Sequence, residues 1–437
     1  MNEPRPQPVN LVRAIGRWSL VALTVNSIIG SGIFGLPAVI AAVLGNLSPW
    51  AVLLSGAAMG VIISCYAEVA SQFADSGGTY LYVRHAFGRF AGLQVGWMSL
   101  LSRFTACAAA VNLLVQYLGE FWPQATHGVP RFTIITLLLG TLGIVNYRGV
   151  IAGAWFSNVT VLAKLLALGA VCAIGAGYLI THPAVYVAPM SADGNGWLRA
   201  VLLLFFAYGG YEAALNPMGE ARNPRRDAPF ALILGLIIVT LLYTVLQFVV
   251  IGVLPDAAHS DRPLADAARV FMGGAGAALI SAGALISVYG YLSANLLTGP
   301  RGMFALAERG DFPARFARVH PRMRTPHVAI AVFAALIWIF ALFGSFSWNV
   351  TLSAVARLAY YGAVCAAVPM LRSRQPGAAM FRVPGGPTLP ILGVAICAVL
   401  LTRVDFTKSV ILIATIVIAT LNWFGVRKRE LLRAKAS

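Results

Sequence analysis

The sequence predicts an all-α polytopic membrane protein. Of its 437 residues, 59% are hydrophobic and only 11% are charged, and the mean hydropathy is +0.79. No ordinary soluble domain has this composition, and the apolar residues gather in runs that approach the ~20 residues a membrane-spanning helix needs. We expect twelve transmembrane helices, at residues 18–44, 50–73, 90–118, 132–145, 154–179, 196–218, 229–254, 274–297, 328–343, 351–371, 389–401 and 410–424.

The basic residues are distributed unevenly between the two sides of this arrangement. Most of the 32 lysines and arginines fall in loops on one side, and cytoplasmic loops carry the excess of basic residues. Both termini are therefore expected in the cytoplasm, and the polar start of the chain does not resemble a cleavable signal peptide. The same asymmetry explains the net charge of +17 without a nucleic-acid partner.

The first apolar run has a polar, glycine-rich centre, which predicts a helix broken near the bilayer midplane. Residues 26–35 read Asn-Ser-Ile-Ile-Gly-Ser-Gly-Ile-Phe-Gly, and Pro37 follows. Glycine and proline weaken a helix interior, and the freed backbone groups must be buried in protein or line a wet cavity. The alternative is close helix packing through Ser27, Ser31 and Gly35. This stretch alone does not decide between a broken helix and close packing.

The sixth predicted helix repeats this interruption. Residues 203–218 begin apolar and then meet two glycines, a carboxylate and an Asn-Pro pair. Matched interruptions in the first and sixth helices predict two inverted repeats of five helices, at about 18–179 and 196–371, with the substrate bound where the broken ends meet. Helix packing explains one interrupted helix but not the pair, so we favour a site where helix N-termini attract an anionic group.

Four segments resemble the amino acid–polyamine–organocation (APC) superfamily of transporters and occur in the order of that family. They are Gly30-Ser31-Gly32-Ile33-Phe34, Glu68 with the following residues 76–80, residues 219–229 and residues 301–313. The resemblance implies a ten-helix core of the leucine-transporter type over residues 18–371 and two additional helices within 372–425. Residues 1–17 and 426–437 are expected to form cytoplasmic tails.

The resemblance also implies a substrate site between the first and sixth helices, surrounded by the third, eighth and tenth. The carboxylate of the substrate would contact backbone near Ser31 and Gly32, and its amino group would face carbonyls near Ala207. Phe206 is expected to cover the substrate. The full expected set is Ser27, Ile28, Gly30, Ser31, Gly32, Ile33, Phe206, Ala207, Tyr208 and Gly209.

Ionisable residues inside predicted helices are costly in a bilayer and usually have a partner or a function. Lys164 lies in the middle of the fifth helix, where snorkelling to the surface is the alternative. In sodium-independent APC members, a lysine in a similar local sequence stands where sodium-coupled relatives bind a cation. We expect its ammonium near the freed carbonyls of residues 26–29, either as a fixed brace or as a group that exchanges a proton.

Four further charged residues are candidates for coupling or gating. Glu212 matches a glutamate of APC members that handle acidic or cationic amino acids, and a pair with Arg103 or Arg357 is the alternative. For the two arginines, charge pairing is favoured over substrate contact. Glu220, like Glu68, is expected at a cytoplasmic helix end as a gate or capping group paired with loop arginines.

These observations predict an inner-membrane amino acid permease that works by alternating access. Sodium-independent exchange or proton-linked transport is expected, with neutral amino acids favoured. The alternatives are a cationic amino acid or polyamine antiporter and a sensor that does not transport. The expected partners are an amino acid, the lipid bilayer and, in the proton-linked case, protons. No nucleotide fingerprint or metal-ligand cluster indicates an enzyme or a cofactor, and the sequence leaves the oligomeric state open.

Overall fold

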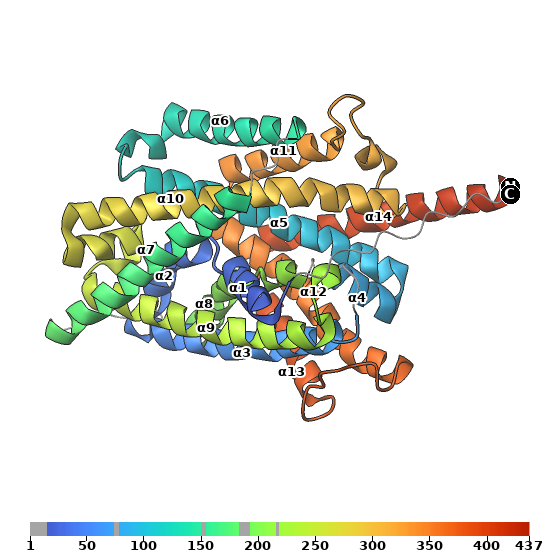
Figure 1. Ribbon diagram of the computed structural model, residues 1–437, viewed down its shortest axis with the longest axis horizontal. Coiled ribbons are helices and arrows are strands. Elements are labelled where there is room, and N and C mark those ends of the chain that lie inside the picture. The colour runs from blue at the N-terminus through green and yellow to red at the C-terminus, as the bar shows by residue number, and fades with distance from the viewer. Residues whose placement is uncertain (1–14, 74–77, 150–153, 183–192, 216–217, 437) are drawn as a thin grey trace.

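The computed structural model describes residues 15–73, 78–149, 154–182, 193–215 and 218–436, and these segments form helices and short connections without a β-sheet (Figure 1). The α-helices are α1 Arg17–Ile28, α2 Gly32–Leu44, α3 Ser48–Ala70, α4 Gly78–Phe87, α5 Arg89–Leu118, α6 Gly128–Tyr147, α7 Ala154–Thr181, α8 Gly194–Tyr208, α9 Pro224–Val253, α10 Pro263–Glu308, α11 His327–Phe343, α12 Phe346–Arg374, α13 Thr388–Leu401 and α14 Phe406–Ala436. Short 3₁₀ helices connect some of them, and η3 Tyr211–Leu215 and η4 Met218–Glu220 follow α8.

The first and sixth predicted helices are both interrupted. The first is divided into α1 and α2 by residues 29–31, and the sixth ends as α8 and continues after two glycines as the short η3. Nine helical stretches among the described residues are long and apolar enough to cross a membrane, and one of them joins α2 to α3; α11 and α13 are apolar but shorter. The all-helical polytopic fold is confirmed, whereas its division into two inverted repeats remains a prediction.

Two features differ from the expected helix pattern. Residues 78–87 form α4, a helix that hydropathy did not indicate because it is amphipathic and too short to cross a bilayer. The expected eighth helix is part of α10, which bends at Gly273, where φ is +71°, and then runs to Glu308 instead of ending near residue 297. Hydropathy marks the apolar part of a helix, and the helix itself extends beyond it.

The interrupted helices lie inside the bundle. α2 packs against α8, α1 packs against η3 and α9, and α5 packs against both α10 and α12. In α5, 89% of the most apolar stretch is buried, compared with 17% in α6 and in α14, so α5 is central and the other two are peripheral. Figure 1 shows α6 beside α11 at one edge and α13 at the opposite edge.

Ion pairs tie the helices together at the end of the bundle that holds the start of α1. Arg17 in α1 pairs with Asp227 in α9 at 3.0 Å. Asp311, just after α10, is fully buried and pairs with Arg84 and Arg89, which lie on either side of the α4–α5 junction. These contacts join α1 to α9, and the end of α10 to α4 and α5, at the end where the sequence predicts the cytoplasm.

The two glutamates expected at this end have different surroundings. Glu68 is fully buried in α3, and both of its oxygens lie 2.6 Å from the guanidinium of Arg372 in the last turn of α12; the backbone N–H of Val383 also donates to it. Glu220 is exposed instead, and in the described part of the chain no ion pair joins it to an arginine. Its backbone carbonyl accepts a hydrogen bond from the N–H of Ile15.

Candidate functional site

The break between α1 and α2 leaves backbone carbonyls that other helices satisfy. α1 ends at Ile28, and Ile29 and Gly30 depart from helical geometry before α2 begins. The hydroxyl of Tyr243 in α9 lies 3.2 Å from the carbonyl oxygen of Ile28 and 3.3 Å from that of Ala207 in α8. One tyrosine therefore joins the carbonyl ends of both interrupted helices, as buried backbone acceptors require.

Lys164 satisfies two further carbonyls at the same break. Its side chain, in α7, is 7% exposed, and its ammonium donates to the carbonyl oxygens of Asn26 at 2.9 Å and Ile29 at 2.7 Å. Snorkelling is therefore excluded for this side chain in the structure, because the ammonium points inward to the α1–α2 break. The ammonium thus lies against backbone carbonyl oxygens. That it replaces a coupling ion in the transport cycle remains a prediction.

The second interruption contacts the first through backbone. Gly210 has φ +107°, and a Cβ at this position would lie 2.4 Å from the carbonyl oxygen of Ser27, so both the conformation and the space require glycine. The N–H of Gly210 donates to Glu212 at 2.9 Å. The end of α1 and the start of η3 therefore lie directly against each other.

The start of α2 meets the end of α8. Ser31 occupies the N-cap position of α2, yet its side chain makes no capping hydrogen bond, and Ser31 is only 3% exposed. A Cβ on Gly32 would lie 3.0 Å from Cα of Ala207 and 3.3 Å from the ring of Phe206. A buried helix N-terminus without a capping side chain presents N–H groups to an anion, and here it faces the carbonyl end of α8 at close range.

A charged cluster lies beside this contact. Arg357 in α12 pairs with Glu212 at 3.3 Å, and its guanidinium lies 5.9 Å from the centre of the Phe206 ring. Ser102 accepts a hydrogen bond from Arg357 at 3.1 Å, and the hydroxyl of Tyr360 donates to Glu212 at 2.9 Å. Of the two arginines considered as partners for Glu212, the structure selects Arg357.

A cavity of about 430 Å³ extends from this cluster toward the end of the bundle that holds the start of α1. It is bounded by α1, α5, α7, η3, α10 and α12. Five of the residues singled out from the sequence line it: Ser27, Arg103, Lys164, Glu212 and Arg357. The cavity does not reach Ile28, Gly30, Ser31, Gly32, Ile33, Phe206, Ala207, Tyr208 or Gly209, so the expected substrate contacts at α2 and α8 are closed together in this structure.

Several cavity residues were not identified from the sequence. Ser102, Gly210, Tyr291, Asn295 and Tyr360 all line the space. Polar side chains in apolar helices were the available signal, but hydropathy does not reveal which way a helix is rotated. Tyr208 illustrates the same limit, because its hydroxyl donates to the carbonyl of Val52 in α3 and so points away from the cavity.

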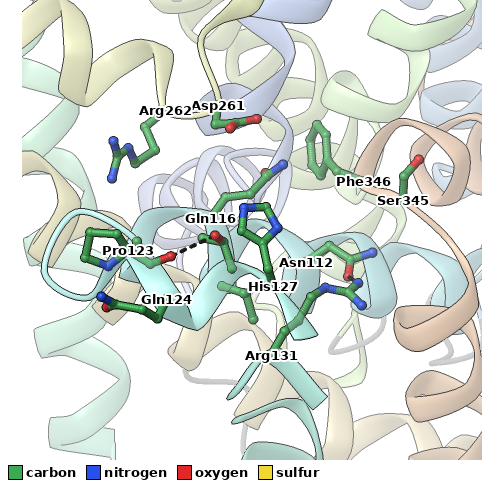
Figure 2. A pocket seen from close by; sticks show the side chains of 13 residues that line it. Asn112, Gln116, Pro123, Gln124, His127, Arg131, Asp261, Arg262, Ser345 and Phe346 are labelled. Carbon is green, nitrogen blue, oxygen red and sulfur yellow. Dashed lines mark hydrogen bonds between the residues drawn. The ribbon is translucent and has the colours of Figure 1, made fainter. Parts of the chain in front are cut away.

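A second cavity, of about 630 Å³, lies at the opposite end of the bundle. Figure 2 shows the side chains that line it. It is lined by the end of α5, the start of α6, the connection before α10 and the start of α12. Phe346 is on its wall and also packs against α2, since a Cβ on Gly35 would lie 2.6 Å from the Phe346 ring. Contact between α2 and α12 therefore lies on the side of this cavity nearest the helix breaks.

Two interrupted helices that meet beside a buried cavity are typical of secondary transporters. Residues 15–426 match the family model described as "Amino acid permease", and the chain belongs to that family. It is thus an amino acid transporter and an integral, multi-pass membrane protein. The family consists of transporters rather than enzymes.

Three relatives from Bacillus subtilis (strain 168) are similar over nearly their whole length. The serine/threonine exchanger SteT is 30% identical, covering 96% of this chain and 98% of the relative. The methylthioribose transporter is 29% identical and the branched-chain amino acid permease BcaP is 27% identical, each covering 95% of this chain and 93% of the relative. The names of these relatives span different substrates, so similarity at this level establishes the transporter class and not the cargo.

Proposed function

We propose that this permease moves amino acids across the inner membrane without sodium, by exchange or linked to protons, with both termini in the cytoplasm. The observation that carries the proposal is the position of Lys164 against the carbonyls of Asn26 and Ile29. Unwound backbone carbonyls of this kind coordinate the coupling cation in many secondary transporters. An ammonium offers three donors to the same oxygens, so a covalently attached cation takes the place of a dissolved one.

The substrate would bind at the two helix breaks. Its carboxylate would accept hydrogen bonds from the uncapped N-terminus of α2 near Ser31 and Gly32, where the helix dipole favours a negative group. Its ammonium would face the carbonyl end of α8 near Ala207, where the same dipole favours a positive group. Binding requires α2 and α8 to separate, because Gly32 and Ala207 now lie in contact.

Alternating access would use the two cavities in turn. The cavity at the α1 end leads to the breaks from one side, and the contact of Phe346 with Gly35 separates the breaks from the cavity on the other side. Rocking of one group of helices against the other would open this contact and close the first cavity. The substrate would thereby be exposed to one side of the membrane at a time.

The charges around the first cavity argue against a dicationic cargo. Arg103, Lys164 and Arg357 supply three cations and Glu212 one carboxylate. A polyamine or cationic amino acid would meet net repulsion there, whereas a zwitterion brings no net charge. Neutral amino acids are therefore favoured over cationic ones, in line with the names of SteT and BcaP.

Flux in proteoliposomes tests the proposal. The purified protein would be loaded with one amino acid and offered a radiolabelled panel, with sodium replaced by choline, with and without an imposed pH gradient. We expect uptake that ignores sodium; stimulation by internal substrate indicates exchange, and accumulation driven by the pH gradient indicates proton linkage. A strict sodium requirement would contradict the proposal. Binding of an amino acid, seen as a raised unfolding temperature, without any flux would identify a sensor instead.

A further inference from the structure

We infer that Arg103 binds a second anionic group of the substrate, so that amino acids with acidic side chains are preferred over their amides. This inference rests on the proposed transport of amino acids and concerns the selectivity of the same cavity. The two arginines that line this cavity differ in their surroundings. Arg357 pairs with Glu212 and donates a hydrogen bond to Ser102. Arg103 follows Ser102 in α5 but is not held by these side chains.

Arg103 presents an unengaged guanidinium to the cavity. Within the described residues it makes no hydrogen bond and no ion pair, although it lies in the middle of α5, the most buried of the membrane-spanning helices. The other cations on the wall are occupied, Lys164 by two carbonyls and Arg357 by Glu212. The side chain of Arg103 is half-buried on the cavity wall, and ionisable residues within membrane-spanning helices usually mark a binding site or a path.

The charge balance of the cavity identifies the chemistry that would engage Arg103. The cavity wall carries three cations and one carboxylate, so a zwitterionic substrate leaves the excess positive charge in place. A substrate with a side-chain carboxylate brings one further negative charge. A guanidinium matches a carboxylate through two parallel N–H···O bonds, which are stronger than bonds between neutral groups.

The size of the cavity suits a ligand of this kind. Its volume of about 430 Å³ lies within the range of small-molecule sites. Asn26 also lines the cavity, but its side-chain oxygen Oδ1 is buried and has no surface open to the cavity. The guanidinium of Arg103 is therefore the group on the wall that a substrate carboxylate would engage.

The test compares acid and amide pairs of equal shape. Counterflow uptake of a neutral amino acid would be measured in competition with aspartate against asparagine and with glutamate against glutamine. In the wild type, we expect each acid to compete at least about tenfold better than its amide, the factor that a single charge-assisted hydrogen bond supplies. This ratio should fall to near one in Arg103→Gln and to an intermediate value in Arg103→Lys, which keeps the charge but loses the planar fork.

Arg322→Gln, which alters an exposed arginine that does not line the cavity, is the matched control and should keep the wild-type ratio. Wild-type protein that transports neutral amino acids but does not prefer the acids overturns the inference and leaves the proposed function standing. An unchanged ratio in the folded Arg103 variants also overturns it. Absence of all amino acid flux in the wild type would overturn the proposed function itself. If Arg103→Gln fails to fold, the acid-to-amide ratios of Arg103→Lys and of the wild type still test the inference.

Discussion

The guanidinium of Arg357 lies so close to Gly209 that no side chain fits between them. A Cβ built on Gly209 would be 1.6 Å from Nη1 of Arg357. Gly209 caps the C-terminal end of α8, where the helix dipole favours a cation. The chain thus places one of its own cations beside the region where the amino group of a substrate is proposed to bind.

We expect Gly209→Ala to displace Arg357 and break its pair with Glu212. The backbone at Gly209 has an ordinary φ of −75°, so the effect should come from overpacking, which costs about 1–3 kcal/mol. Thermal unfolding in detergent measures the loss, and Gly177→Ala, at a glycine with open space around it, is the control. If the clash is the cause, Gly209→Ala should cost much less in an Arg357→Gln background.

Neutralising one member of the Arg357–Glu212 pair should lower the stability of the protein more than neutralising both. Glu212→Gln leaves the buried guanidinium without its counterion, a change that costs about 3–5 kcal/mol for buried pairs. The double variant Glu212→Gln with Arg357→Gln removes both charges and should regain part of that loss. Unfolding temperatures of the two single variants and the double variant provide the double-mutant cycle. Additive losses would show that the two side chains do not depend on each other.

Lys164→Ala should impair transport at least about tenfold, because the loss of the ammonium leaves two buried carbonyls without donors. Uptake into proteoliposomes in choline measures the loss, and Lys428→Ala, at an exposed lysine of α14, is the control. Sodium should leave the wild type unaffected but partly restore the Lys164→Ala variant, since the vacated oxygens can then take a dissolved cation. Full activity of Lys164→Ala in choline would refute a role for this ammonium.

Gly32→Val should abolish substrate binding while the protein still inserts and folds. A Cβ on Gly32 already comes within 3.0 Å of Ala207, and the two methyl groups of valine would fill the space into which the carboxylate must enter. Uptake and ligand-induced thermal shifts measure the effect. Gly140→Val, at an exposed position of α6 with no atom nearby, controls for valine in a helix. Undiminished uptake by Gly32→Val would show that the substrate binds elsewhere.

The predicted topology can be tested with single cysteines in a cysteine-free background. Val129, at the start of α6, is 76% exposed, and Gln375 lies in the exposed connection after α12. An impermeant thiol reagent should label Val129→Cys in intact cells and Gln375→Cys only after the membrane is opened. The opposite pattern would invert the assignment of the cytoplasmic side.

The sequence was most informative where unusual residues occur in apolar surroundings. Glycines and serines at the middle of the first helix located its break. The lysine inside the fifth helix marked a residue with a special role, and the resemblance to the APC superfamily implied that it contacts the freed carbonyls. Hydropathy could not choose between Arg103 and Arg357 as the partner of Glu212, because that choice depends on how α5 and α12 are rotated about their axes. It also could not show that Phe346 closes on Gly35, a contact between residues remote in sequence and both apolar.

The contact of Gly210 with the carbonyl of Ser27 has a mechanical consequence. Side chains absorb small displacements by changing rotamer, but two backbones in contact have no such freedom. We therefore expect a shift at the end of α1 to displace the start of η3 as well, because no side chain lies between the two backbones to absorb it. Movement at one helix interruption should then be accompanied by movement at the other.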